Sequence, residues 1–282
     1  MARIIAVANQ KGGVGKTTTA INLAASFAAA EVRCLLVDCD PQSNATSGVG
    51  LGRDPERRNT YHLMSGEARA EDLVQPTSLE DLYVIPASKN LIGANVELVN
   101  EEGREFRMKN ALQPLRDNYE FIVLDCPPAL DLLTLNALVA ADSVLIPMQA
   151  EYFAMEGVSE LLDTMDRIRQ SLNPALEIEG VVLTMYDDRT NLAQQVTNEL
   201  KTFFGERLFQ TTIPRNIRLA EAPSYGLPVL SYDPRSRGSE SYLRLAKEIM
   251  SKLAQKSHSA KTSSDKSTQE LLDAAGIGTT TP

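Results

Sequence analysis

The chain has 282 residues, a formal net charge of −9 at pH 7 and an apolar content of 43%. This length permits one α/β domain or two small ones, with a sizeable core. The acidic balance argues against a generally basic nucleic-acid binder. It still permits one local basic face, because salt screens charges beyond about 10 Å.

The composition also argues against a secreted or membrane-spanning protein. No apolar run approaches the roughly 20 residues that a membrane span needs. The N-terminus runs directly into a strand-like stretch without the basic region of a secretory signal. The three cysteines, Cys34, Cys39 and Cys126, form no C-x-x-C pair. We therefore expect a reduced, cytoplasmic protein with no membrane partner.

The first chemically informative stretch is residues 9–18, with the sequence NQKGGVGKTT. It follows an apolar run at 4–8, which predicts a buried parallel strand, and precedes an alanine-rich run at 19–27 with helical spacing. A glycine-rich turn in this position lets backbone N–H groups face an anion at the positive end of the helix dipole. Lys16 would then reach the β- and γ-phosphates of a nucleotide, and the Thr17 hydroxyl would ligate Mg²⁺.

Aspartates end two later strand-like runs. The run 33–38 ends in Asp38 and is followed by Asp40, and the run 121–125 ends in Asp125. Ligands bind at the carboxyl ends of strands in open α/β sheets, where a carboxylate can hold a metal or orient an attacking water. Asp38 could instead cap a helix. The run that ends in Asp125 is a weak signal alone and a strong one together with residues 9–18.

Strand-like and helical stretches alternate along the chain. Further strands are expected at 82–86, 143–147 and 178–185, and helices at 60–64, 91–100, 106–116, 132–141, 158–171, 194–204 and from 238 to about 253. This alternation predicts an α/β fold with a doubly wound, mostly parallel sheet flanked by helices. Together with the predicted phosphate-binding loop at 9–18, such a sheet is typical of the P-loop NTPase fold. We expect one ATPase domain over residues 1–255. The low-complexity tail, 256–282, is expected to be too polar to order itself.

Arginines gather at loop–helix junctions in the C-terminal third, where they could reach nucleic-acid phosphates. Arg189 lies in the sequence DDRTNL, and Arg218 lies in PRNIRLAEAPS. Ordinary surface pairing with nearby acids, such as Asp187 and Glu221, explains them equally well from the sequence alone.

The sequence KGGVGKTT at 11–18 departs from the strict pattern G-x-x-x-x-G-K-[ST], because Gln10 replaces the first glycine and Lys11 opens the loop. It resembles the deviant Walker A motif of the ParA/MinD family of ATPases. The stretches DCDPQ, LDCPP, RTNL and PRNIRLAEAPS resemble the chromosomal, Soj-type ParA subfamily, and the resemblance covers roughly residues 2–255. Without it, Lys11 would be a solvated loop charge.

The resemblance implies a role for each matching residue. Lys11 would reach the partner's nucleotide across an ATP-bound sandwich dimer, Asp40 would position the attacking water, and Lys16 would complete the catalytic set. The implied contacts to ATP are Lys11, Gly12, Gly13, Val14, Gly15, Lys16, Thr17 and Thr18, with Met185, Pro214 and Asn216 near the adenine. The implied metal site contains Thr17, Asp38 and Asp125. Arg189 and Arg218 would bind DNA.

The resemblance also implies a working cycle. ATP and Mg²⁺ bind, two subunits close into a homodimer, and the dimer binds double-stranded DNA without sequence preference. A ParB-type centromere-binding protein then stimulates hydrolysis, and the dimer dissociates. The protein would accordingly partition DNA and associate with the nucleoid. The summed phosphate contacts of two subunits would explain why DNA binding depends on nucleotide.

Other classes of protein share the loop. A MinD-like, membrane-cycling ATPase needs an amphipathic basic C-terminal helix, and residues 251–262 lack bulky apolar residues at helical spacing. An iron–sulfur reductase of the nitrogenase iron-protein type needs interface cysteines, and neither Cys39 nor Cys126 matches the ligand positions of that family. A small-molecule enzyme such as dethiobiotin synthetase gives no reason for Lys11 or for the arginines.

Overall fold

The computed structural model describes residues 1–52, 54–151 and 154–274, with side chains except at 154–157 and 257–274. A seven-stranded sheet forms its centre, with strand order β3-β4-β2-β5-β1-β6-β7. The strands are β1 (Arg3–Val7), β2 (Cys34–Asp38), β3 (Gln75–Pro76), β4 (Leu82–Ile85), β5 (Phe121–Asp125), β6 (Ser143–Met148) and β7 (Glu177–Leu183). Every pairing is parallel except that of β3 with β4.

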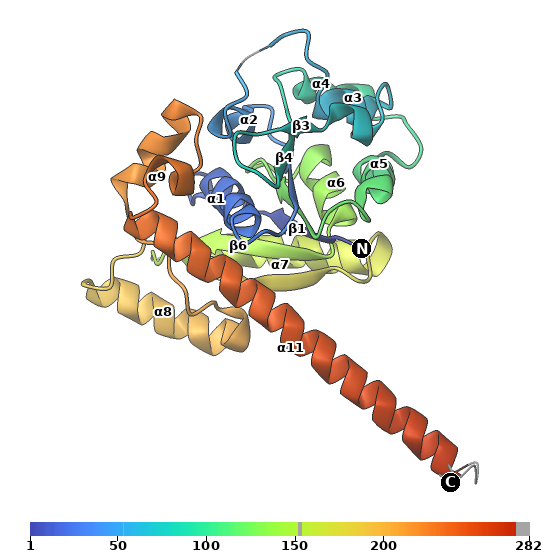
Figure 1. Ribbon diagram of the computed structural model, residues 1–282, viewed down its shortest axis with the longest axis vertical. Coiled ribbons are helices and arrows are strands. Elements are labelled where there is room, and N and C mark those ends of the chain that lie inside the picture. Colours follow the sequence, from blue (N-terminus) through green and yellow to red (C-terminus); the bar gives the residue numbers. More distant parts are fainter. Residues whose placement is uncertain (53, 152–153, 275–282) are drawn as a thin grey trace.

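Helices cover both faces of the sheet (Figure 1). They are α1 (Lys16–Ala28), α2 (Asn44–Gly48), α3 (Thr60–Ser65), α4 (Leu91–Glu97), α5 (Arg107–Leu112), α6 (Leu132–Ala140), α7 (Ala154–Ser171), α8 (Asn191–Phe204), α9 (Ile217–Glu221), α10 (Val229–Tyr232) and α11 (Arg237–Ala274). One buried cluster joins alternate strand residues to α3–α8, and a second joins the intervening residues to α1, α2 and α9–α11. The predicted doubly wound, mostly parallel fold is confirmed.

Three structural features were not evident in the sequence. Strand β3 has only two residues and pairs antiparallel at the sheet edge. Helices α2, α9 and α10 have four or five residues each, which is too short for a periodic apolar pattern. Helix α11 continues to Ala274 rather than ending near Leu253, and residues 251–275 contain neither Gly nor Pro to stop it.

The first half of α11 packs on the body of the protein, and its C-terminal part projects away from it (Figure 1). Three side chains one turn apart fix the packed half. Glu248 accepts hydrogen bonds from two backbone N–H groups of the segment after α8, Lys252 lies 4.2 Å from the centre of the Phe209 ring, and Lys256 pairs with Glu177 of β7 at 2.9 Å. The division of the chain at residue 255 stays a prediction.

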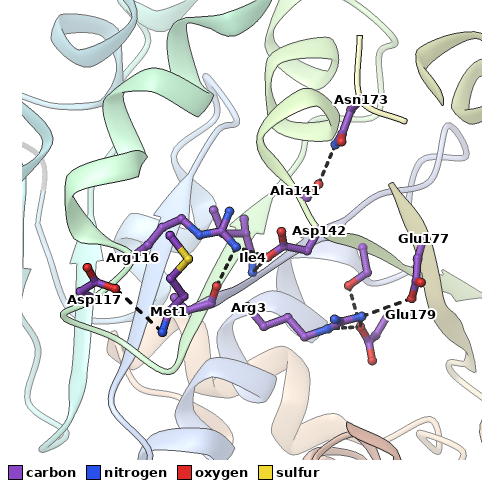
Figure 2. A network of polar contacts seen from close by, with 12 residues as sticks. Met1, Arg3, Ile4, Arg116, Asp117, Ala141, Asp142, Asn173, Glu177 and Glu179 are labelled. Carbon is purple, nitrogen blue, oxygen red and sulfur yellow. Dashed lines mark hydrogen bonds and ion pairs between the residues drawn. The ribbon is translucent and has the colours of Figure 1, made fainter. Parts of the chain in front are cut away.

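The amino ends of the strands carry a network of charged contacts (Figure 2). Arg3 pairs with the buried Glu179 at 2.6 Å, and Arg116 pairs with Asp142 at 2.6 Å. The Asp142 carboxylate also accepts a hydrogen bond from the backbone N–H of Ile4 at 2.8 Å. These contacts join β1, β6 and β7 with the segment that precedes β5, so this edge of the sheet is held rigidly.

Candidate nucleotide-binding site

The carboxyl ends of β1, β2 and β5 bring the predicted phosphate loop and the aspartates together. Strand β5 lies between β1 and β2, and the register places Asp125 beside both Val7 and Asp38. Residues 8–15 connect β1 to α1 directly above this point. A strand register therefore assembles residues that are more than 100 positions apart in the sequence.

Two glycines shape the loop by adopting left-handed backbone conformations. Gly13 has φ 74° and Gly15 has φ 85°, which residues with a Cβ rarely adopt. Gly15 precedes the first turn of α1 and supplies no side chain to its free N–H groups. A Cβ added at Gly12 or Gly13 would meet no atom within 4 Å. The loop is therefore open on one side and presents helix N–H donors, which suits a phosphate.

Lys16 is the buried cation of the site. Only 7% of the residue is exposed, and its Nζ donates to the backbone oxygen of Lys11 at 3.0 Å. Burial lowers the pKa of this ammonium, and the negative charge of Asp125 opposes that shift. An ammonium has three donors, so Lys16 retains the capacity to bind phosphate oxygens.

Lys11 lies at the surface and contacts an acid of its own chain. Its Nζ is 2.7 Å from Glu151 Oε2, and 38% of the Lys11 side chain is exposed. Glu151 follows β6, so this pair bridges the loop and the neighbouring strand end. An exposed pair of this kind contributes little to stability, roughly 0–1 kcal/mol. Lys11 can therefore exchange Glu151 for another anion at small cost.

The three aspartates occupy different environments. Asp125 is fully buried, and neither of its carboxylate oxygens has a hydrogen-bond partner in the described part of the chain. Burial raises its pKa well above the usual range, the nearby Asp38 charge raises it further, and the Thr17 hydroxyl opposes this rise. A buried carboxylate without partners is costly, so this geometry is typical of a group that receives a cation.

Asp38, by contrast, is already hydrogen-bonded. It accepts from the backbone N–H of Asp40 at 3.1 Å, and from the backbone N–H and hydroxyl of Thr46 at 2.8 and 2.7 Å. Burial raises the pKa of Asp38 to about 6, although these hydrogen bonds oppose the shift. Asp38 thus fixes the loop that carries Asp40. Asp40 is 8% exposed, and its Oδ1 accepts from the backbone N–H of Gln42 at 2.9 Å.

The residues present fit Mg²⁺ that is shared with a nucleotide. Among the residues that the structure describes, no cluster of three or more His, Cys, Asp or Glu side chains could hold a metal ion. Mg²⁺ typically needs only one or two carboxylates when phosphates and water complete its shell. The free oxygens of Asp125 and the hydroxyl of Thr17 provide such a partial set.

Sequence reasoning missed the residues that support the loop from behind. Thr184 donates its hydroxyl to the backbone oxygens of Val14 at 2.8 Å and Met148 at 3.1 Å. Asn9 donates to the backbone oxygen of Pro147 at 2.8 Å. Asn9 and Thr184 each follow the last residue of a strand by one or two positions, which is the signal that could have identified them.

Of the three residues predicted near the adenine, Met185 lies beside the loop. The methyl carbon of Met185 would lie 4.0 Å from a Cβ at Gly15, and the adjacent Tyr186 forms an isolated bridge with Pro214. The Asn216 side chain accepts from the backbone N–H of Arg218 at 2.8 Å and begins α9. The structure therefore brings Met185 to the loop, whereas Asn216 caps a helix.

The two predicted DNA-binding arginines are both paired with acids. Arg189 makes a bidentate contact with Asp187, with its Nη2 at 2.5 Å, while 84% of its side chain is exposed. Arg218 contacts Glu221 at 2.8 Å and Asp233 at 3.2 Å. The ordinary surface pairing expected from the sequence is thus present, and binding of a phosphate would have to displace it.

Three other arginines near Arg218 are exposed and have no ion pair within the described ranges: Arg215, Arg235 and Arg237. Leu219 of α9 packs closely against Gly238 at the start of α11, so the loops before these two helices form one corner of the molecule. This corner carries the uncompensated positive charge that the overall acidic composition does not reveal.

An open glycine loop before a helix, a buried lysine and an unpaired strand-end aspartate define a P-loop nucleoside-triphosphate hydrolase. A family model described as an AAA domain matches residues 2–178. The chain is 54% identical over 255 residues to the chromosome partitioning protein ParA of Myxococcus xanthus, covering 90% of each chain. The chain belongs to the ParA/Soj family of chromosome-partitioning ATPases, within the ParA/MinD group.

Of two further comparisons, the first agrees with this family and the second with the fold. The sporulation initiation inhibitor protein Soj of Bacillus subtilis is 53% identical over 249 residues, which cover 88% of this chain and 98% of that protein. A crystal structure of cobyrinic acid a,c-diamide synthase from Mycobacterium smegmatis with ADP and magnesium has a TM-score of 0.77 at 33% identity, covering 88% of this chain and 93% of that one. In the described ranges, no helix is both long enough and apolar enough to cross a bilayer.

Proposed function

We propose that this protein is an ATP-dependent DNA-partitioning ATPase that works as a nucleotide-closed homodimer on DNA. The observation that carries the proposal is the juxtaposition of the buried Lys16 ammonium with the unpaired carboxylate of Asp125 beneath an open glycine loop. A triphosphate with Mg²⁺ supplies the charges that both groups lack. The high identity to chromosome-partitioning relatives supports the biological role.

Within the site, each residue has a distinct task. Lys16 and the N–H groups of residues 12–18 bind the phosphates, and Asp125 with Thr17 holds Mg²⁺. Asp40 orients the attacking water, since it is nearly buried yet uses only Oδ1 in a local turn. Asp38 positions Asp40 by accepting the N–H of that residue, and the implied metal contact of Asp38 would have to be made through water.

Closure of the dimer transfers Lys11 to the partner's nucleotide. In the isolated chain Lys11 is held by the half-exposed Glu151. The triphosphate carries more negative charge than one carboxylate, so the lysine gains by exchanging partners once two subunits face each other. The same exchange would leave Glu151 without its cation, which adds a small cost to closure.

DNA binding belongs to the corner formed by the loops before α9 and α11, together with the loop before α8. Arg215, Arg235 and Arg237 are free to contact phosphates directly, whereas Arg189 and Arg218 first release their carboxylates. Two corners in one dimer double the number of phosphate contacts and thereby the salt-sensitive binding energy. A DNA-bound dimer accounts for an association with the nucleoid in the cytoplasm, and a ParB-type protein would trigger its release.

Retention of the protein on duplex DNA, measured with ATP, ADP and no nucleotide, tests this function. We expect retention only with ATP, and we expect Asp40→Ala to prolong it while hydrolysis falls by about 10²–10⁴. Gly12→Val is the matched control, because a Cβ at this position meets no atom within 4 Å in the isolated chain. This variant should fold and stay monomeric in sedimentation with ATP. Equal retention without nucleotide would overturn the proposal.

A further inference from the structure

Two glycines bring the segment that carries Asp40 into contact with the segment that carries Arg218. Gly50 follows α2 by two residues and has φ 92°, and Gly226 follows the short helix η5 (Ala222–Tyr225) and has φ 67°. A Cβ at Gly226 would lie 2.9 Å from Gly50 Cα, and a Cβ at Gly50 would lie 3.0 Å from the backbone oxygen of Gly226. The two backbones therefore touch with no side chain between them.

The segment on the Gly50 side belongs to the nucleotide site. Asp40 lies four residues before the first residue of α2, and Thr46 of α2 donates its hydroxyl to the Asp38 carboxylate at 2.7 Å. The backbone N–H of Leu51 donates to the backbone oxygen of Thr46 at 3.2 Å, which closes the turn around Gly50. A shift of this loop when nucleotide and Mg²⁺ bind beside Asp38 is therefore carried along α2 to Gly50.

The segment on the Gly226 side belongs to the corner proposed to bind DNA. Helix α9 ends at the residue before η5 begins, so the two form one continuous segment. A Cβ at Gly48 of α2 would lie 3.8 Å from Pro223 Cβ of η5, and Figure 1 shows α2 beside α9. Close-packed groups transmit a displacement rather than absorb it. A shift of Gly50 therefore moves α9 and Arg218.

The next segment along the chain, α10, is attached to a different part of the nucleotide site. Asn22 of α1 is 4% exposed, and its Oδ1 accepts from the backbone N–H of Val229, the first residue of α10, at 2.7 Å. The Asn22 Nδ2 donates to the backbone oxygen of Thr18, in the first turn of α1, at 2.8 Å. Helix α10 is therefore held by the helix that begins at the phosphate loop, whereas α9 follows α2.

Arg218 spans these two segments. It contacts Glu221, within its own helix, at 2.8 Å, and Asp233, directly after α10, at 3.2 Å. A displacement of α9 relative to α10 changes the distance to Asp233 and leaves the distance to Glu221 unchanged. Loss of one of the two carboxylates weakens the surface pairing that a DNA phosphate has to displace.

We propose that Gly50 and Gly226 are positioning residues that couple bound nucleotide to the release of Arg218. The proposal rests on the function proposed above. The triphosphate acts on α2 through the loop that carries Asp40, the glycine contact passes the displacement to α9, and Arg218 leaves Asp233. Such coupling is reciprocal, so DNA that holds Arg218 favours the ATP-bound arrangement of the loop. The contact acts within each subunit, in addition to the joining of two corners by dimerisation.

A fluorescent reporter tests the glycine contact directly. The chain contains no tryptophan, so Tyr225→Trp introduces a single one beside Gly226, at a side chain that is 65% exposed and stacks on Tyr232. At a concentration at which sedimentation shows monomers, we expect Mg-ATP, and not Mg-ADP, to change its emission. Adding Gly226→Ala should abolish that change, because the new Cβ fills the contact and holds the two segments at one separation.

Retention on duplex DNA measures the consequence. We expect Gly226→Ala to dimerise with ATP, whereas the ratio of its DNA affinities with ATP and with ADP should fall at least about fivefold below the wild-type ratio. Gly103→Ala is the matched control, because Gly103 has nearly the same φ, 68°, and a Cβ there meets no atom within 4 Å. It should behave as wild type in both measurements. Gly50→Ala reaches the same contact from the other side and replaces Gly226→Ala if that variant does not fold.

The outcomes separate the two proposals. If wild type is not retained on DNA with ATP, the proposed function fails, and the emission change alone decides the glycine contact. If wild type is retained and Gly226→Ala keeps both the wild-type ratio and the emission change, the function stands and the coupling is overturned. A fall in the ratio that leaves the emission change intact, or an equal fall in Gly103→Ala, would also overturn the coupling, because the alanine would then not act through Gly50.

Discussion

The amino ends and the carboxyl ends of the strands use charged residues in opposite ways. At the amino edge, the carboxylates of Glu179 and Asp142 each lie 2.6 Å from an arginine (Figure 2). At the carboxyl ends of the strands, Asp125 is fully buried, and neither of its oxygens has a hydrogen-bond partner among the residues that the structure describes, while Lys16 Nζ donates to the backbone oxygen of Lys11. Removing one partner of a paired charge leaves the other uncompensated, whereas a buried charge without a partner is costly until a ligand neutralises it. In one sheet, the amino ends of the strands, where the charges are paired, are structural. The carboxyl ends, where Asp125 lacks a partner, are functional.

The largest expected effect is the loss of nucleotide binding when Lys16, at the carboxyl ends of the strands, is removed. Lys16→Ala should weaken ATP binding by at least about 30-fold, because truncating one partner of a desolvated charged contact costs roughly 2–5 kcal/mol. Isothermal titration with Mg-ATP measures this directly. Lys11→Ala is the matched control, since Lys11 contacts Glu151 at the surface, and it should retain monomer binding within a few fold. Equal losses of ATP affinity in Lys16→Ala and Lys11→Ala would contradict the different roles assigned to the two lysines.

The next effect concerns the stability of the amino edge. Glu179→Ala should lower the free energy of unfolding by about 3 kcal/mol, because it removes the ion pair with Arg3 and the hydrogen bond from Ser143 at 2.6 Å. Denaturant unfolding gives the value. ATP hydrolysis per folded molecule should stay unchanged, since this contact lies at the edge opposite the phosphate loop. A loss of activity in fully folded protein would show that the two edges are coupled.

The smallest effect has the opposite sign and sharpens the comparison. In Mg²⁺-free buffer, Asp125→Asn should raise the free energy of unfolding at pH 8 by about 1–3 kcal/mol, because it removes a buried carboxylate without partners. The same change should abolish Mg²⁺-dependent hydrolysis. If Asp125→Asn destabilised the protein at pH 8, the interactions of the carboxylate with Thr17 and Lys16 would outweigh the cost of its burial.

The raised pKa of Asp125 makes the gain in the free energy of unfolding of Asp125→Asn depend on pH. The folded state holds the proton to a higher pH than the unfolded chain does, so the penalty is absent below the unfolded-state pKa, grows as the pH rises above it and is complete above the folded-state pKa. The difference between variant and wild type should therefore shrink as the pH falls. Asp38, whose pKa is raised to about 6, is present in both proteins, so its loss of stability as the pH rises toward 6 appears in each series of melts and not in their difference. Thermal melts from pH 5 to pH 8 measure both.

Local sequence was sufficient for the parts of the protein that depend on neighbouring residues. The run 4–8, the loop 9–18 and the helix after it form one continuous unit, so their order alone predicts a phosphate site. The confirmed alternation of strands and helices predicts a parallel sheet for the same reason. The short elements β3, α2, α9 and α10 escaped because they are held by neighbouring structure and carry no periodic pattern of their own.

By itself, the sequence determined the phosphate loop, the strand-end aspartates and membership of a family, because each is written in contiguous residues. Only the tertiary structure decided which aspartate is free and which is occupied. Asp38 and Asp125 look alike as strand ends, but Thr46 reaches only Asp38. It likewise decided that Arg189 and Arg218 are paired, while Arg215, Arg235 and Arg237 have no ion pair with any residue that the structure describes. Such differences depend on distances between residues in the folded protein, and the local sequence does not specify these distances.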